Sequence, residues 1–308
     1  MRKTCLEMVH KLAQKDERIF FIGSDLGIGT LDEFKKEIPE RFFMEGVSEA
    51  NIIGMAAGMA LEGKIPYVNT IATFITRRCF EQLVLDLCLQ NVNVRLIGNG
   101  GGLVYAPLGP THLAIEDIAI LRSLPNMTIL VPADANEMRK MMPETVNHPG
   151  PIYIRIAKGG DAIVTDERPF EIGKVFPMKE GKEALIVTTG VILGKALKAA
   201  DILKKEGIET AVLHCPTIKP LDSETILEYA KNTKVIVTAE EHSIIGGLGS
   251  AVAEILLEAN FDSKKRFKRI GIPDCFADQY GSQESLMNYY GLKEEKIVTT
   301  IKSLHAAS

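Results

Sequence analysis

The sequence predicts an α/β protein of two domains, each a mostly parallel β-sheet flanked by helices. Three observations support this fold class. Short runs rich in Val, Ile and Phe alternate with longer segments of helical spacing, the alternation pauses once near the middle, and 308 residues suit about two domains. Strands that alternate with helices favour parallel sheets covered on both faces.

The first domain is predicted over residues 1–165. Its short apolar runs are typical of buried strands, and the stretches between them place apolar residues at helical spacing. The helix at Glu49–Leu61 is so rich in Gly and Ala that we expect it to be packed closely on all sides. The predicted strands are Arg18–Gly23, Val92–Gly98, Met127–Pro132 and Ile152–Ile156, and the predicted helices are Glu49–Leu61, Phe80–Gln90 and Asn136–Val146.

A linker and a second domain follow. Residues 161–181 contain Pro169, Pro177 and mixed charges, which interrupt the alternating pattern. The pattern then resumes, and we predict a second α/β domain over residues 180–308. Its predicted strands are Glu183–Thr189, Thr210–Leu213 and Lys234–Ala239, and its predicted helices are Leu193–Glu206, Ser223–Lys231 and Leu248–Ala259.

Composition narrows the class of protein. The net charge of −4, the pI near 6.0 and the dispersed Lys and Arg predict no nucleic-acid or membrane partner. The polar start MRKTCLEMVH is unlike a signal peptide, and no run of about 18 apolar residues predicts a membrane span, so we expect a cytoplasmic protein. The five scattered cysteines fit reduced thiols, and without CxxC or HExxH we expect no zinc site.

Three features could carry chemistry, and each has a structural alternative. Gly100–Gly102 follows a strand without forming GxxxxGK[ST] or GxGxxG, so it is a tight turn or a weak phosphate-loop signal. Glu49 in the first helical turn either complements the helix dipole or serves as a proton-transfer carboxylate in an apolar setting. His112 follows the turn at Gly109 and Pro110, where it caps the chain or faces a substrate.

A resemblance to a known family spans essentially the whole chain. The segment GPTHLAIEDIAILRSLPNMTILVPAD, from Gly109 to Asp134, resembles the signature of the transketolase pyrimidine-binding domain. GVSEANIIGMAAGMA resembles the helix of that family that carries the cofactor-activating glutamate. PERFFMEGVSE, NTIATFITRRCFEQ and YIRIAKGGD occur in the expected order, and EEHSIIGGLGS resembles the C-terminal domain. The chain is most similar to the C-terminal subunits of split transketolases.

The resemblance implies a site for thiamine diphosphate between α/β domains of two chains. Glu49 matches the glutamate that hydrogen-bonds the aminopyrimidine ring and thereby activates the cofactor. Phe74 matches the aromatic residue that stacks on that ring, with a core phenylalanine as the alternative. Asp25 matches an acidic residue close to the cofactor, with a strand-end cap as the alternative. Gly101 is assigned to the same cofactor pocket.

The resemblance also implies a substrate end, where this chain departs from the pattern. His112 matches a substrate-facing histidine, and Arg155 matches an arginine that grips a sugar phosphate, unless it forms a structural ion pair. Gly100 stands at a substrate-binding position that is histidine in typical members. Leu108 replaces an acid that contacts a donor hydroxyl, and a phosphate-binding serine is replaced near Gly29. We therefore expect an atypical donor or acceptor, such as a deoxy or otherwise modified sugar.

One absence predicts a partner. The family binds diphosphate and Mg²⁺ through Gly-Asp-Gly and a later Asn, and this chain contains no Gly-Asp-Gly. We expect the metal ligands on a separate N-terminal subunit, in an α2β2 heterotetramer in which this chain also self-associates as a homodimer. The implied reaction moves a two-carbon ketol unit from a ketose to an aldose, either of them a sugar or sugar phosphate, and this chain is active only with that subunit.

Two alternatives remain open at this point. The beta subunit of a 2-oxo-acid dehydrogenase is compatible with Gly100–Gly102 and with EEHSIIGGLGSAV. A non-catalytic scaffold subunit that kept the fold is the alternative from another class, although the presence of Glu49 and Phe74 argues against it. His242, in the same EEHS segment, is interpreted as a buried or interface residue of the C-terminal domain.

Overall fold

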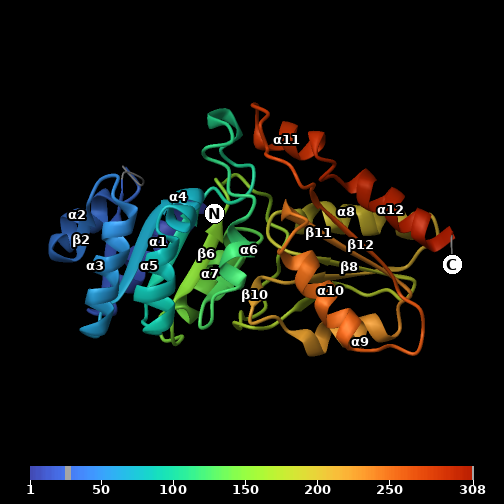
Figure 1. Ribbon diagram of the computed structural model, residues 1–308, viewed down its shortest axis with the longest axis horizontal. Helices are drawn as coiled ribbons and strands as arrows, with labels where there is room; N and C mark the ends of the chain where they lie inside the picture. Colours follow the sequence, from blue (N-terminus) through green and yellow to red (C-terminus); the bar gives the residue numbers. More distant parts are fainter. Residues whose placement is uncertain (25–28, 307–308) are drawn as a thin grey trace.

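Two mostly parallel β-sheets lie side by side in the computed structural model, which describes residues 1–24 and 29–306 (Figure 1). Helices cover both faces of each sheet. The predicted fold class is therefore confirmed. Among the described residues no helix is long and apolar enough to cross a membrane.

The first sheet has seven strands in the order β10-β5-β6-β4-β3-β1-β2. All neighbouring pairs are parallel except β10 and β5. The strands are β1 (Ile19–Gly23), β2 (Phe42–Met44), β3 (Ile65–Ile71), β4 (Arg95–Asn99), β5 (Thr128–Leu130), β6 (Ile152–Ile156) and β10 (Thr217–Lys219).

Alternate side chains of these strands enter two different cores, as the period of two in a strand requires. Phe21 packs in one core with α1 (Arg2–Ala13) and α7 (Ala135–Glu144), and Ile22 packs in the other core on the opposite face. The helices of that second face are α3 (Glu49–Leu61), η2 (Leu83–Leu89) and α6 (Asp117–Arg122). The shorter helices are α2 (Asp32–Glu37), η1 (Pro39–Arg41), α4 (Ala72–Arg77), α5 (Phe80–Gln82) and η3 (Ala106–Leu108).

The second sheet has five strands in the order β12-β11-β8-β9-β7, and only β7 runs antiparallel to its neighbour. The strands are β7 (Phe176–Lys179), β8 (Ala184–Thr188), β9 (Thr210–His214), β11 (Val235–Ser243) and β12 (Arg266–Ile272). Helices α8 and α12 pack on one face and helices α9 and α10 on the other. Their bounds are α8 (Ile192–Lys205), α9 (Ser223–Lys231), α10 (Leu248–Glu258), α11 (Gln283–Tyr289) and α12 (Glu294–Ala306).

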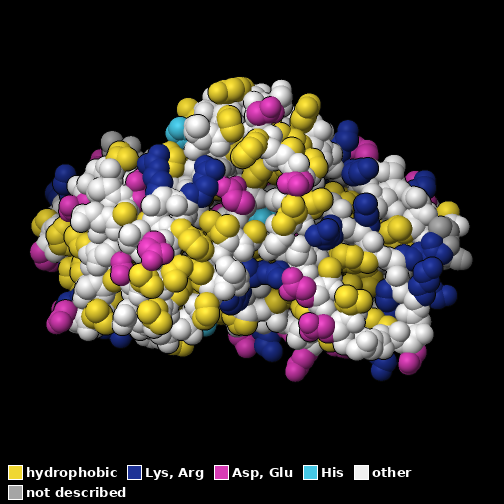
Figure 2. Space-filling model, viewed as in Figure 1, with side chains coloured by type: hydrophobic (Ala, Val, Ile, Leu, Met, Phe, Trp, Pro, Cys, Tyr) yellow, Lys and Arg dark blue, Asp and Glu magenta, His cyan; other side chains and the backbone are white. Residues whose placement is uncertain are grey.

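Two helix predictions need correction. The predicted α-helix Phe80–Gln90 is one turn of α-helix followed by a π-helical stretch, because an apolar pattern does not distinguish 3.6 residues per turn from a wider turn. The helix α3 has the predicted bounds but is not packed on all sides. Gly54, Gly58 and Leu61 are exposed, and Figure 2 shows hydrophobic side chains gathered over this part of the surface.

The two halves of the chain are joined by a strand that crosses between them. Strand β10 comes after the second domain has begun, yet it pairs with β5 at the edge of the first sheet. The ammonium group of Lys219, at the end of β10, donates to the carbonyl oxygen of Arg122 at 2.9 Å and to that of Leu124. One apolar core is continuous across this seam. The division into residues 1–165 and 180–308 remains a prediction, and β10 crosses it.

Lys219→Ala should destabilise both domains together. It removes two hydrogen bonds from a charged donor to backbone carbonyls at the seam, so we expect a loss of about 1–3 kcal/mol. Circular dichroism during heating should show one transition at a lower midpoint. Lys234→Ala, which removes an exposed lysine, is the control. Two separate transitions would contradict the shared core.

Candidate functional site

The candidate site lies at the carboxyl ends of β1, β3 and β4. Strand β2 lies on one side of β1 in the sheet, and strands β3 and β4 lie on the other side. Such a reversal of strand order leaves a crevice where ligands bind in open α/β sheets. Polar side chains gather there: the Ser24 hydroxyl donates to Thr70 Oγ1 at 2.8 Å, and the Asn99 amide donates to Asn69 Oδ1.

Glu49 is held in a buried position at the start of α3. Its side chain is only 4% exposed, although it carries a formal charge and stands in the first helical turn. The guanidinium of Arg78 lies 3.3 Å from Glu49 Oε2 and 3.4 Å from Oε1. The structure thus gives this carboxylate a cationic partner in a mostly dry setting.

Phe74, on α4, contacts both Arg78 and His112. The centre of the Arg78 guanidinium lies 3.4 Å from the centroid of the Phe74 ring. The ring of His112 lies 5.2 Å from the same centroid and is tilted by 59°. Glu49, Phe74 and His112 are therefore brought into one chain of contacts, in which Arg78 is the link that the sequence analysis missed. The spacing of four between Phe74 and Arg78 on a helix could have indicated it.

His112 is half-buried, and its Nδ1 lies 2.9 Å from the hydroxyl of Thr111. Arg77 holds the segment around His112 in place, because it pairs with Glu116 at 3.1 Å and donates to the Thr111 carbonyl. The Gly109–Pro110 turn therefore places an imidazole beside the Phe74 ring ahead of α6.

The glycines at 100–102 are required by close approaches of side chains. A Cβ on Gly100 would meet the ring of Tyr105 at 2.2 Å, and one on Gly101 would meet Arg155 at 2.5 Å. Gly100 and Gly102 also have φ angles of +73° and +70°. The amides of Gly100 and Gly101 both donate to the carbonyl of Ile156. The loop is therefore a tight turn, and its amides serve the fold.

Arg155 lies in an internal ion pair, the alternative that the sequence had left open. Its Nε donates to Asp117 Oδ2 at 2.7 Å, and both side chains are almost fully buried. Its Nη2 donates to the carbonyl oxygens of Ala114 and Glu241. A guanidinium engaged in this way is not free to grip a substrate phosphate, so the geometry favours the structural ion pair.

The Glu240-Glu241-His242 segment of β11, in the second domain, contacts Arg155 through the carbonyl oxygen of Glu241. Glu240 accepts hydrogen bonds from the amides of Leu248 and Gly249 at the start of α10. Glu241 accepts from the amide of Leu103 at 2.8 Å and from Gln283. Burial raises the pKa of Glu241 to about 7 against the opposing charge of Arg155.

His242, the third residue of this segment, is fully buried, and its Nε2 lies 3.3 Å from the amide of Ala119 on α6. This agrees with the predicted interface role. Asp25, predicted near the cofactor, lies outside the described residues.

The residues present fit a planar, hydrogen-bonding ring. A guanidinium is flat and carries N–H donors, and here one lies over the ring of Phe74 while it faces the Glu49 carboxylate. An aminopyrimidine is equally flat, and it combines an N–H donor on its amino group with ring nitrogens that can share a proton with a carboxylate. Among the described residues no cluster of His, Cys, Asp or Glu could hold a metal ion.

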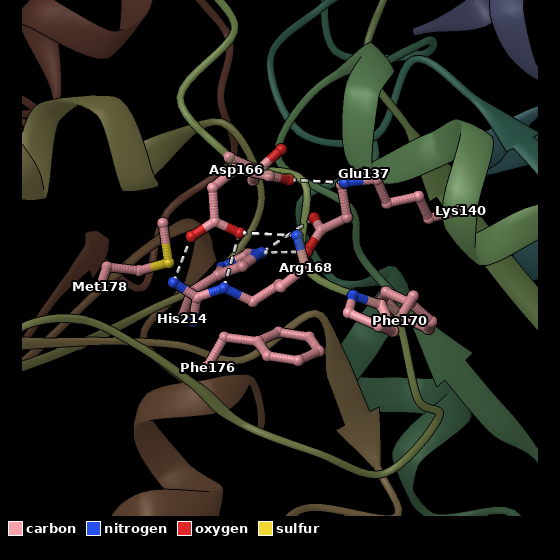
Figure 3. A pocket seen from close by; sticks show the side chains of 10 residues that line it. Glu137, Lys140, Asp166, Arg168, Phe170, Phe176, Met178 and His214 are labelled. Carbon is pink, nitrogen blue, oxygen red and sulfur yellow. Dashed lines mark hydrogen bonds and ion pairs between the residues drawn. The ribbon is translucent and has the colours of Figure 1, made fainter.

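A separate small cavity, lined by both charged and apolar side chains, lies where α7, the connecting segment and β9 meet (Figure 3). Glu137 on α7 meets His214 on β9 at 2.9 Å, with Asp166 and Arg168 of the connecting segment alongside. The cavity volume of about 20 Å³ suits about one water molecule. His214 Nδ1 has no partner among the described residues, so a water that bridges it would satisfy this atom.

Comparison with known proteins identifies the family. Residues 1–160 match the family described as transketolase, pyrimidine binding domain, and residues 173–297 match transketolase, C-terminal domain. The chain belongs to the transketolase family.

Two relatives span almost the same length as this transketolase-family chain. The 6-deoxy-6-sulfo-D-fructose transketolase subunit SqwH of Clostridium sp. (strain MSTE9) is 37% identical over 97% of this chain and 92% of its own. A subunit of the apulose-4-phosphate transketolase of Phocaeicola vulgatus is 36% identical over 97% of this chain and 95% of its own. A solved structure described as a split gene transketolase, inactive beta4 tetramer, is 37% identical, covers 99% of this chain and 98% of its own, and has a TM-score of 0.91.

Arg155→Met should destabilise the chain. It leaves Asp117 as an uncompensated buried charge, and we expect a cost of about 3–5 kcal/mol in chemical denaturation. Adding Asp117→Asn should recover part of that loss. A stable Arg155→Lys variant whose KM rises for phosphorylated substrates alone would restore the phosphate-binding role.

The raised pKa of Glu241 should appear in the pH dependence of stability. Its ordinary value is 4.5 and its value in the fold is about 7, so between these pH values the native chain keeps a proton that the unfolded chain has lost. The contribution of Glu241 to stability should therefore be present below pH 4.5 and fall by up to about 3 kcal/mol as pH rises through 7. Subtracting the profile of Glu241→Gln should isolate this fall, with exposed Glu258→Gln as control. A flat difference would contradict it.

Proposed function

We propose that this chain is the C-terminal subunit of a thiamine-diphosphate-dependent transketolase. It would transfer a two-carbon ketol unit from a ketose donor to an aldose acceptor only when joined to an N-terminal subunit. The observation that carries the proposal is that the buried Glu49 carboxylate and the half-buried ring of Phe74 both contact the guanidinium of Arg78, at the carboxyl ends of the first sheet. Family membership and the subunit names of the relatives support it.

The positions of Glu49, Phe74 and His112 suggest a separate role for each residue in the proposed reaction. Glu49 would hold a proton at a ring nitrogen of the aminopyrimidine, and its burial would keep water from competing for that proton. Phe74 would orient the ring by stacking, and His112 would face the substrate from beside it. When bound, thiamine diphosphate supplies the electron sink for breaking and forming carbon–carbon bonds. Gly101, whose position is fixed by Arg155, stays a proposed backbone boundary of the cofactor pocket.

The substrate end would suit a modified sugar. Leu108 is half-exposed, and Gly100 leaves no polar side chain where typical members have one. The names of two relatives refer to 6-deoxy-6-sulfo-D-fructose and to apulose 4-phosphate, which supports an unusual donor or acceptor here. A reconstituted enzyme that prefers xylulose 5-phosphate and ribose 5-phosphate to every deoxy sugar would contradict this part.

A partner subunit is part of the proposal. This chain has no Gly-Asp-Gly, so the ligands of Mg²⁺ and of the diphosphate would come from the N-terminal subunit of a cytoplasmic α2β2 complex. The solved neighbour is named an inactive tetramer of beta chains, which supports self-association without activity. Affinity capture from the native extract should recover a partner carrying Gly-Asp-Gly. Capture of a lipoyl acyltransferase would favour the dehydrogenase alternative instead.

Glu49→Gln should abolish ketol transfer while the fold is kept. Glutamine is nearly isosteric but cannot hold the proton, so kcat in the reconstituted pair should fall by at least about 100-fold. Glu62→Gln, at the exposed end of the same helix, is the matched control. Unchanged activity in Glu49→Gln would support the scaffold alternative.

A further inference from the structure

Arg78 makes two contacts at once, although its side chain is half-exposed. Its guanidinium centre stands 3.4 Å above the Phe74 ring, at the separation of stacked planar groups. Its Nη1 points at both oxygens of Glu49, at 3.3 and 3.4 Å. A single flat cationic group therefore fills the place that is bounded by the ring on one side and the carboxylate on another.

The proposed function requires the same two contacts of the cofactor. An aminopyrimidine ring must lie flat on Phe74 and present a ring nitrogen to Glu49, so it needs the position that the guanidinium holds. From this coincidence we infer that Arg78 is a displaceable placeholder for the aminopyrimidine, which thiamine diphosphate must move aside in order to bind. This inference rests on the proposed function and adds a residue that controls cofactor entry.

The charge of Glu49 explains why the site needs a placeholder. The carboxylate is 4% exposed, and within the described residues Arg78 supplies its only hydrogen-bond donor. A buried carboxylate without a partner is strongly unfavourable. Arg78 therefore compensates the charge until a ring that shares a proton with Glu49 takes its place.

The geometry also explains why the placeholder can leave. The Arg78 side chain is 46% exposed at the end of α4, and its hydrogen bonds are longer than the 2.7–2.9 Å typical of charged pairs. Hydrogen bonds of that length are weaker than the short bonds of a well-formed charged pair. Arg155 offers the contrast, because its bond to Asp117 is 2.7 Å and both partners are buried. Of the two arginines, Arg78 is the one free to swing into solvent.

Arg78→Ala should strengthen cofactor binding. Apparent affinity falls by the fraction of molecules in which the site is open, so removing the placeholder should lower the half-saturating concentration of thiamine diphosphate about two- to fivefold. The measurement is the cofactor dependence of ketol transfer by the reconstituted pair at fixed Mg²⁺, with the change falling on this concentration more than on kcat. Direct titration of the pair with thiamine diphosphate by calorimetry gives a readout that does not depend on activity.

Two further variants test whether the effect on cofactor affinity depends on the charge of Arg78, on its planar group, or on the loss of any exposed arginine. Arg78→Lys keeps the charge but lacks the planar group, so it should lie between wild type and Arg78→Ala. Arg139→Ala is the matched control, because Arg139 is also exposed and lies on α7, on the opposite face of the first sheet from α3. It should leave cofactor affinity as in wild type.

The outcomes are distinguishable from those that test the proposed function. Weaker binding in Arg78→Ala would make Arg78 a cofactor contact and overturn the inference. Equal affinity in wild type and Arg78→Ala, with loss of activity in Glu49→Gln, would also overturn it and leave the proposed function standing. If neither the wild-type pair nor any variant binds thiamine diphosphate, the proposed function fails, and the inference fails with it.

Discussion

The buried ion pair between Arg155 and Asp117 is the interaction on which the rest of the structure depends. It joins β6 to α6, and through the carbonyl of Glu241 it also holds the second domain. A buried guanidinium is tolerable only when its charge and most of its N–H groups are satisfied. That need explains why the loop after β4 is made of glycine: any side chain at Gly101 would collide with Arg155.

The candidate site differs from this buried ion pair, because its arginine is half-exposed to solvent. Glu49, Phe74 and Arg78 stand at the edge of the first sheet, where an exposed arginine covers a buried acid. The site therefore offers a flat aromatic surface and a carboxylate. The exposed small residues along α3, including Gly54 and Gly58, leave the neighbouring surface open as well. A buried, hydrogen-bonded network therefore lies next to an open surface, which is compatible with the proposed partner subunit.

Local pattern predicted about half of the elements and missed or misjudged the others. The bounds of α3, the strand Ile152–Ile156 and the turn before His112 followed from spacing and turn residues alone. The π-helical stretch and β10 did not, because the wide turn repeats a nearly helical pattern and the strand pairs with a distant edge. Asp25 stays a prediction, since it lies outside the described residues.

By itself, the sequence predicted the fold class from periodicity. Its resemblance to the transketolase family, which local motifs carry, implied that Glu49, Phe74 and His112 belong to one site. Only the tertiary structure decided what each arginine does. Arg155 and Arg78 carry the same charge, and their partners are 38 and 29 positions away in the chain. Burial fixes the first in the fold, while exposure leaves the second free over the Phe74 ring. Solvation of a charge depends on which distant residues surround it, and no local pattern records that.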